Sequence, residues 1–386
     1  MRILSLILCL ALTLNCTVQD DFLKTDFVAE YDSIVNSKDR TTNNSLLQIR
    51  EFAKSGNPNW FLRIGYFINA NNIMFRATND SKYLKYNSEI ILEIDKQGTK
   101  LEKGRKWVAK VAASDQNRSM NNQEFMLYEG YLMRYVAEFA YIIKSFGLEK
   151  QFPQYSNFVA FAEDNFNKWR DRSIGGFKDE SLLFGIRTHM GAQWATTATY
   201  LSLLVQNPVR KVLYATIYQK YNVRLRRNFK TERVDGAKYY VWNSSWNRVF
   251  SNQQRQRQAK IGKENEIQDV AHGNHVVQYI IDSYELGIPF WSNQDLQLLA
   301  NTVKLKTWNK TDNSFWDTVD GRTSNDSTLV NTGWRQSDGW MKLMLYDHDL
   351  FSIYKDFYIK SDEAKKSYLN TQFIANFEYY KSKVQK

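Results

Sequence analysis

The spacing of apolar residues constrains this chain most, because they recur at intervals of three and four along nearly its whole length. That interval is the period of an amphipathic α-helix, whereas strands alternate at an interval of two. Only four prolines, Pro58, Pro153, Pro208 and Pro289, occur in 386 residues. Since proline ends or kinks a helix, their scarcity leaves room for long helices. The sequence therefore predicts an all-α protein.

The predicted helices fall into pairs that follow a leading helix near residues 45–55. In each pair the first helix is richer in small and apolar residues and the second carries more charge, so we expect the first to be inner and the second outer. A ring of such pairs is an α/α toroid, here an incomplete barrel of about five to seven helical hairpins. The pairs are 60–78 with 81–95, 123–147 with 155–171, 189–206 with 209–225, 269–287 with 293–309, and 339–358 with 367–383.

Long connections precede the predicted inner helices. In a toroid they would gather at one rim and line a cleft, and long connections in a compact domain are usually functional or disordered. These connections are rich in Trp, Tyr, Arg and Asn, which favours function. They are residues 98–121, 171–187, 222–268 and 307–332.

The N-terminus reads as an export signal. "MRILSLILCLALTLNC" has a positive Arg2 and then an apolar run that is too short to span a bilayer. The segment resembles a bacterial lipobox, with Cys16 as the lipidated residue, and "CTVQDD" resembles the surface-export signal of Bacteroidetes lipoproteins. We expect a signal peptide over 1–15, a flexible tether over 16–40 and a single toroid catalytic domain over 41–386. This places the protein at the outer membrane or cell surface, whereas an ordinary secretory signal would place it in the periplasm.

The formal net charge is +11, and removal of the signal with Arg2 leaves +10. A surplus of this size favours polyanionic partners through the summed electrostatic field. Export argues against nucleic acid. The basic residues are dispersed, which argues against membrane contact beyond an N-terminal lipid anchor. An acidic polysaccharide is the expected partner of a protein that we expect to be monomeric.

The segment "QDVAHGNHVVQYIID" places Asp269, His272 and His275 three residues apart, on one face at the start of a predicted inner helix. Three interpretations compete. The three side chains could bind a metal ion, although no second cluster supports such a site. They could be structural, with Asp269 as the N-cap. They could also be catalytic, and the neighbouring motifs favour this third interpretation, with no metal and no cofactor.

Those motifs are "RTHMGAQW", which carries Arg187 and His189, and "ERVDGAKYYVWNSSWNR". Together with "DVAHGN" they resemble the α/α-toroid polysaccharide lyases that cleave uronate polymers, such as glucuronan and alginate lyases. The resemblance covers residues 60–349 as a pattern of hairpins. It implies that His189 is the inner-helix histidine, that Tyr239 or Tyr240 is the tyrosine, and that Arg233 is the arginine of such a site.

The expected chemistry is β-elimination, which must neutralise the uronate carboxylate, remove the proton on C5 and protonate the leaving O4. We assign Asn274 and His272 to the carboxylate and His189 to the base or its helper. Tyr239 or Tyr240 would be base or acid, with its pKa lowered by Arg233. The expected substrate-binding residues are Arg187, Glu129, Trp194, Trp242, Trp246, Arg248, His275 and Trp340.

Two other functions remain open. A glycoside hydrolase on the same fold would need two carboxylates across a cleft, and Asp269 with Glu129 or Asp338 could supply them. A non-catalytic lipoprotein that binds surface glycans would instead use aromatic stacking. Its candidate stacking residues are Trp107, Trp194, Trp242, Trp246, Trp334 and Trp340.

Overall fold

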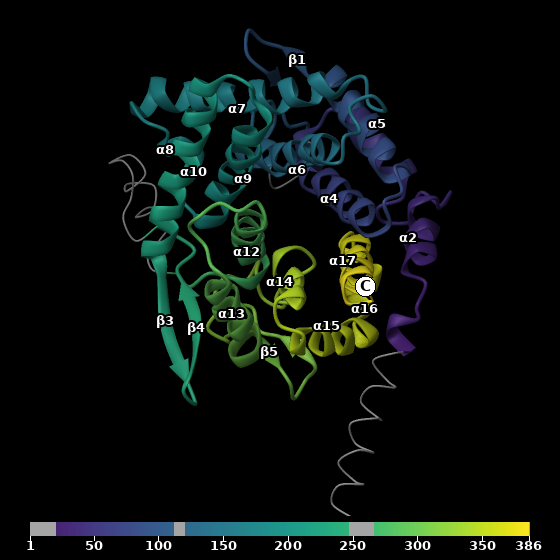
Figure 1. Ribbon diagram of the computed structural model, residues 1–386, viewed down its shortest axis with the longest axis vertical. Helices are drawn as coiled ribbons and strands as arrows, with labels where there is room; N and C mark the ends of the chain where they lie inside the picture. The colour runs from purple at the N-terminus through teal and green to yellow at the C-terminus, as the bar shows by residue number, and fades with distance from the viewer. Residues whose placement is uncertain (1–20, 112–119, 247–265, 386) are drawn as a thin grey trace, which may run out of the picture.

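The protein is mostly helical, as the sequence predicts (Figure 1). A computed structural model describes residues 21–111, 120–246 and 266–385. Its longer helices in chain order are α2 (Phe27–Val35), α3 (Leu46–Ser55), α4 (Phe61–Thr78), α5 (Lys82–Gln97), α6 (Met126–Ser145), α7 (Tyr155–Phe177), α9 (Thr188–Leu204), α10 (Pro208–Asn228), α12 (Val270–Glu285), α13 (Asn293–Thr302), α15 (Asp349–Lys360) and α17 (Asn370–Val384).

Six helical segments contact one another in succession around the middle of the molecule (Figure 1). The helix α4 packs on α6, α6 on α9, α9 on α12, and α12 on the short helix α14 (Gly339–Lys342). The helix α14 contacts α17, and α17 returns to α4. These segments form the inner layer, and most residues of α4, α6, α9 and α12 are buried.

The outer layer covers this succession from outside (Figure 1). The helix α5 packs on α4, α7 on α6 and α10 on α9. Two helices, α10 and α13, begin at residues whose side chains cap the first turn, close to the expected starts at 209 and 293. The Asn207 side chain accepts hydrogen bonds from the first turn of α10, directly before Pro208, and Ser292 with Asp295 forms a capping box at α13. In the first three pairs, the second helix therefore packs on the outside of the first, as expected.

The last pair departs from that order. Residues 339–358 form three pieces, namely α14, a 3₁₀ turn η4 (Leu343–Leu345) and the outer helix α15. The second member, α17, is inner and contacts α4. The backbone at Gly339 explains the break, because an added Cβ would lie 2.4 Å from the Asn274 carbonyl oxygen on α12. A side chain at this position would therefore collide with the backbone of α12.

Part of the expected N-terminal tether is also structured. Phe27, Tyr31 and Val35 of α2 are buried, and α2 packs against α17. The Tyr31 hydroxyl donates a 2.8 Å hydrogen bond to Asn71 Oδ1 on α4. Residues 27–35 are thus part of the folded body, because their apolar face covers the outer side of the C-terminal helix.

Short strands occupy the connections that were expected to be loops. The largest pair is an antiparallel hairpin of β3 (Phe229–Val234) and β4 (Ala237–Trp242), at the lower left of Figure 1. Asp235 and Gly236 at its turn have φ values of 48° and 82°. An Asp-Gly pair with positive φ at both positions is the signature of a type I′ hairpin turn, so the signal was present in the sequence. Two smaller hairpins pair β1 (Thr99–Lys100) with β2 (Arg105–Lys106), and β5 (Trp308–Asn309) with β6 (Ser314–Phe315).

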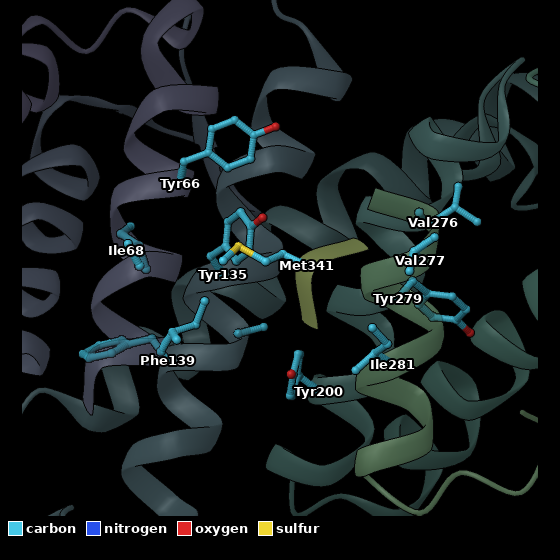
Figure 2. Close-up of a cluster of buried hydrophobic side chains, with 14 of the residues drawn as sticks. Tyr66, Ile68, Tyr135, Phe139, Tyr200, Val276, Val277, Tyr279, Ile281 and Met341 are labelled. Carbon is cyan, nitrogen blue, oxygen red and sulfur yellow. The ribbon is translucent and has the colours of Figure 1, made fainter. Parts of the chain in front are cut away.

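The core lies between the inner helices. In Figure 2, Tyr66 and Ile68 of α4 and Tyr135 and Phe139 of α6 face residues of α12, with Met341 of α14 between them. Aromatic residues make up 15% of the chain, and most of the large ones are buried here or under the outer helices. The aromatic content is therefore explained mainly by packing.

Candidate functional site

Three of the long connections meet at the N-terminal ends of α9 and α12. The Thr188 N–H donates to the Ser244 carbonyl at 2.8 Å, and the Gln268 N–H donates to the Trp242 carbonyl at 2.9 Å. The Val270 N–H donates to the Asp317 carbonyl at 2.7 Å. Residues in or directly beside the connections 171–187, 222–268 and 307–332 are thus joined by backbone hydrogen bonds.

His189 and His272 stack on each other at this rim, and we call them the histidine pair. Their ring centroids are 4.2 Å apart with planes 20° from parallel. His189 starts α9 and is buried, whereas the side chain of His272 on α12 is 33% exposed. Burial lowers the pKa of His189 well below its usual value, and the charges of His272, His275 and Arg187 lower it further. His189 is therefore a neutral imidazole at pH 7, beside a ring that a ligand can reach.

Asp269 orients His272. It is the N-cap of α12, with Oδ1 accepting from the His272 N–H at 2.8 Å, and both carboxylate oxygens lie 3.0 Å from His272 Nδ1. Burial acts to raise the pKa of Asp269, but His272 and Arg187 outweigh it and hold the pKa below its usual value. The structural and the catalytic interpretation of Asp269 are thus compatible. An ionised carboxylate behind Nδ1 leaves Nε2 of His272 as the nitrogen for a proton transfer.

His275 faces the inside of the ring of helices. Its Nε2 is 3.2 Å from the Tyr66 hydroxyl, and its Nδ1 is 3.2 Å from Arg134 Nη1. Since both ring nitrogens have protein partners and the residue is buried, His275 does not contact a substrate in this state. Asp269, His272 and His275 therefore do not converge on a common point. Within the described ranges, no group of three or more His, Cys, Asp or Glu side chains is placed to hold a metal ion.

The tyrosines expected to be catalytic lie elsewhere. The Tyr240 hydroxyl donates to Asp295 Oδ1 of the outer helix α13 at 2.6 Å and accepts from Arg226 of α10 at 2.6 Å. The Tyr239 hydroxyl donates to Glu232 Oε2 on the neighbouring strand. Neither tyrosine contacts the histidine pair within the described structure.

The expected lowering of a tyrosine pKa by Arg233 is also wrong. Burial and Glu232 raise the pKa of Tyr239 to about 12, and burial with Asp295 raises that of Tyr240. Arg233 pairs with Lys238 across the hairpin and is exposed to solvent. The β3–β4 hairpin carries all three residues away from the inner helices, because it packs its tyrosines on α13.

The expected stacking tryptophans are mostly core residues. Trp107, Trp194, Trp242, Trp246 and Trp340 are all buried, at 1% exposure for Trp194 and 6% for Trp246. The Trp340 Nε1–H donates to the Val270 carbonyl at 3.0 Å, and that of Trp107 donates to the Ile94 carbonyl. Trp334 alone of the six is partly exposed. These side chains shape the rim from below and offer no sugar-stacking face.

The candidate carboxylates of a hydrolase are buried and paired. Glu129 accepts hydrogen bonds from Lys168 and Trp169 of the outer helix α7, and burial raises its pKa to about 7. Asp338 accepts from Arg134 and Tyr135 at 2.6 and 2.7 Å and is fully buried. Neither carboxylate is exposed opposite Asp269, so the paired-acid geometry is not formed.

The remaining expected residues divide between the rim and other roles. Arg187 lies at the rim, half-buried, with Nη1 3.2 Å from Glu266. Asn274 is buried, and its Oδ1 accepts from the Trp340 N–H at 3.1 Å, so it fastens α12 to α14. Arg248 and Cys16 lie outside the described residues.

Sequence reasoning did not single out the tyrosines that lie against His275. Tyr131 of α6 lies with its ring centroid 5.0 Å from that of His275, and Asp269 is among the charges that raise its pKa, after burial. Tyr66 stacks on both His275 and Tyr368, and Arg63 lies 4.9 Å over the Tyr368 ring. The signal was the spacing of Tyr131 and Arg134, one turn apart on an inner helix, which places both on its ring-facing side.

A small hollow of about 180 Å³ adjoins the rim beside Asp269. Its lining includes Glu266, Arg322 and Asn325 from the joined connections. Among the described helices none is long and apolar enough to cross a membrane. Comparison with protein families, with curated proteins and with solved structures found no match for this chain.

Proposed function

We propose that the protein is a polysaccharide lyase of α/α-toroid architecture that cleaves a uronate-containing polymer by β-elimination. The observation that carries the proposal is the stacked pair His189–His272, with Asp269 behind His272, at the N-terminal ends of two inner helices. The closed succession of inner helices, covered by outer ones, supports the toroid.

In the proposed reaction, His272 Nε2 removes the proton on C5 of the uronate. The Asp269 carboxylate at 3.0 Å from Nδ1 stabilises the imidazolium that forms. Tyr131 replaces Tyr239 and Tyr240 as the proposed proton donor to O4, because its ring lies 5.0 Å from that of His275, three residues beyond His272 on α12. Arg187, half-buried at this rim and close enough to lower the pKa values of His189 and Asp269, is the candidate that neutralises the carboxylate.

The same geometry argues against the two alternatives. The carboxylates expected for a hydrolase, Glu129 and Asp338, are fully buried in ion pairs. Glu266, which lies beside Asp269 at the rim, is paired with Arg187 at 3.2 Å. A glycan-binding protein would need exposed aromatic rings, but five of the six candidate tryptophans are buried in the core. Among the candidate residues at the rim, the accessible side chain of His272 favours histidine chemistry.

The test is incubation of the purified protein with glucuronan, alginate and other uronate polymers. A lyase produces an unsaturated end that absorbs in the ultraviolet. His272→Ala and Tyr131→Phe should each lower turnover by about a hundredfold, the scale of a lost general acid or base. His348→Ala is the matched control, because His348 is exposed on α15 and should retain full turnover. New reducing ends without ultraviolet absorbance would support the hydrolase. The absence of both signals would support a binding protein.

We also propose that the protein is exported and anchored to the outer membrane or cell surface through a lipid on Cys16. The apolar run that ends at Cys16 supports this location, and the acidic polymer as partner is supported by the +11 charge. Cys16→Ser should abolish incorporation of labelled palmitate in the producing cells. Labelling that persists in this variant would refute the anchor.

A further inference from the structure

Arg63 lies in the first turn of α4 and is partly exposed. Among the residues that the structure describes, none forms an ion pair or a side-chain hydrogen bond with Arg63. Two other arginines of the inner layer and its rim differ in this respect, because Arg134 is paired with Asp338 and Arg187 with Glu266. The charge of Arg63 is therefore available to an anion from outside the protein.

Aromatic rings hold this guanidinium in place. Its central carbon lies 4.9 Å from the centroid of the Tyr368 ring, 5.5 Å from that of Trp60 and 5.9 Å from that of Phe52. Trp60 and Phe52 stack on each other, with centroids 4.1 Å apart and planes 7° from parallel. A guanidinium that lies on ring faces keeps the N–H groups of its edge available, and this planar fork matches the two oxygens of a carboxylate.

Two more polar groups beside Arg63 have no partner in the described part of the chain. They are the Tyr368 hydroxyl and the Trp60 Nε1–H, and both atoms are accessible to solvent. Each of them can donate a hydrogen bond, as the guanidinium does. We call Trp60, Arg63 and Tyr368 the Arg63 cluster. Such a set of donors suits a ligand that is rich in acceptor oxygens and carries a negative charge.

The Arg63 cluster lies on the same side of the molecule as the histidine pair. Tyr66, three residues beyond Arg63 on α4, stacks on Tyr368 and on His275, each at 5.9 Å. The Tyr66 hydroxyl is 3.2 Å from His275 Nε2, and His275 is three residues beyond His272 on α12. The starts of α4 and α12 are thus neighbours. The N-terminal end of a helix carries a partial positive charge, which adds to the attraction for an anion on this side.

We propose that the Arg63 cluster is a second carboxylate subsite, which binds a uronate of the polymer away from the bond that is cleaved. The inference rests on the proposed function, because it takes the histidine pair as the place of cleavage. Arg63 would hold the carboxylate through two N–H groups. Trp60 and Tyr368 would donate to oxygens of the same sugar, whereas Arg187 remains the candidate for the uronate that reacts.

The experiment is isothermal titration calorimetry in a His272→Ala background, which prevents cleavage during the titration. The probes are tetramers of glucuronan and of alginate, each compared with its carboxyl-reduced form, which lacks the charges. At least one acidic tetramer should bind more tightly than its neutral form. Arg63→Gln should weaken that acidic tetramer by about tenfold or more, the scale of a lost charge-assisted hydrogen-bonded pair, and leave the neutral form unchanged.

The matched control is Lys85→Gln, which removes one positive charge at an exposed position of the outer helix α5. This variant should bind the acidic tetramer as its parent does. Circular dichroism checks that both variants are folded. Equal affinity of Arg63→Gln and its parent for the acidic tetramer would overturn the subsite, and so would the absence of any binding by the parent.

Turnover separates this inference from the proposed function. In the protein with His272 intact, Arg63→Gln should raise KM by about tenfold and change kcat by less than about twofold, because a contact away from the reacting atoms acts equally on ground state and transition state. An ultraviolet-absorbing product with an unchanged KM would refute the subsite alone. Carboxylate binding that depends on Arg63, without such a product, would support the subsite and refute the lyase.

Discussion

His275 shows how a residue that the sequence marks as functional can serve the fold instead. Its ring is buried between the Tyr66 hydroxyl and Arg134. A protonated ring would therefore be repelled by the Arg134 charge, and no water would screen the repulsion. Burial and Arg134 therefore lower its pKa well below the usual value. The unfolded chain keeps a histidine pKa of about 6.5. The unfolded state therefore binds the proton more readily than the folded state. The unfolding free energy that is present above pH 6.5 is lost as the pH falls below about 6.5.

We predict that His275→Gln makes the stability less dependent on acid. Between pH 7 and pH 5 the wild type should lose about 1 kcal/mol or more of unfolding free energy that the variant does not lose, since one unit of pKa shift is worth about 1.4 kcal/mol. Urea unfolding at both pH values measures the difference. His348→Gln, at an exposed position, should follow the wild type. Parallel curves for His275→Gln and wild type would contradict the prediction.

At the residue scale, spacing predicted more than composition did. The positions of His189 and His272 at two helix starts were readable, and the structure stacks the two rings. The roles of Tyr239 and Tyr240 were not readable, because alternation along a strand decides which side a residue faces, and this segment was expected to be a loop. Trp194 and Trp340 could not be told from stacking platforms, since burial depends on the neighbouring helices.

At the scale of elements, the helices α3 to α13 follow from apolar spacing and caps, whereas the closure of the structure does not. The last inner position is taken by α17 because α14 is only four residues long. The helix α14 approaches α12 closely at Gly339, a contact between residues far apart in the sequence. The docking of α2 on α17 joins the two ends of the chain in the same way.

The helix α2 should therefore contribute to the stability of the whole domain. Phe27→Ala removes a buried ring that stacks on Phe377 of α17 at 5.6 Å. We expect a loss of about 3 kcal/mol in unfolding free energy, as for other buried phenylalanines. Denaturant unfolding measures it, with Val209→Ala at an exposed position of α10 as the control. A loss no greater than the control's would show that residues 27–35 behave as the tether that the sequence suggested.

At the scale of the molecule, one guanidinium joins four segments of the inner layer. Arg134 of α6 donates to Gln193 of α9 at 2.9 Å and to Asp338 before α14 at 2.6 Å, and it faces His275 of α12. The Tyr135 hydroxyl also donates to Asp338. No sequence pattern indicates this network, because its members come from four helices and meet only when the inner succession closes.

Breaking the ion pair of Arg134 and Asp338 should lower the free energy of unfolding. Both side chains have no exposed surface, so Asp338→Asn leaves a buried cation without its counter-ion and should lower the unfolding free energy by about 3 kcal/mol or more. Removing both charges, as in Arg134→Met with Asp338→Asn, should cost less than the sum of the two single changes, because no uncompensated charge remains. Denaturant unfolding of the four proteins closes this cycle.

Asp362→Asn, which breaks an exposed pair with Lys366, should cause no measurable loss. If the double variant loses as much as both single variants together, the pair is not the coupled tie across the inner layer that its geometry indicates.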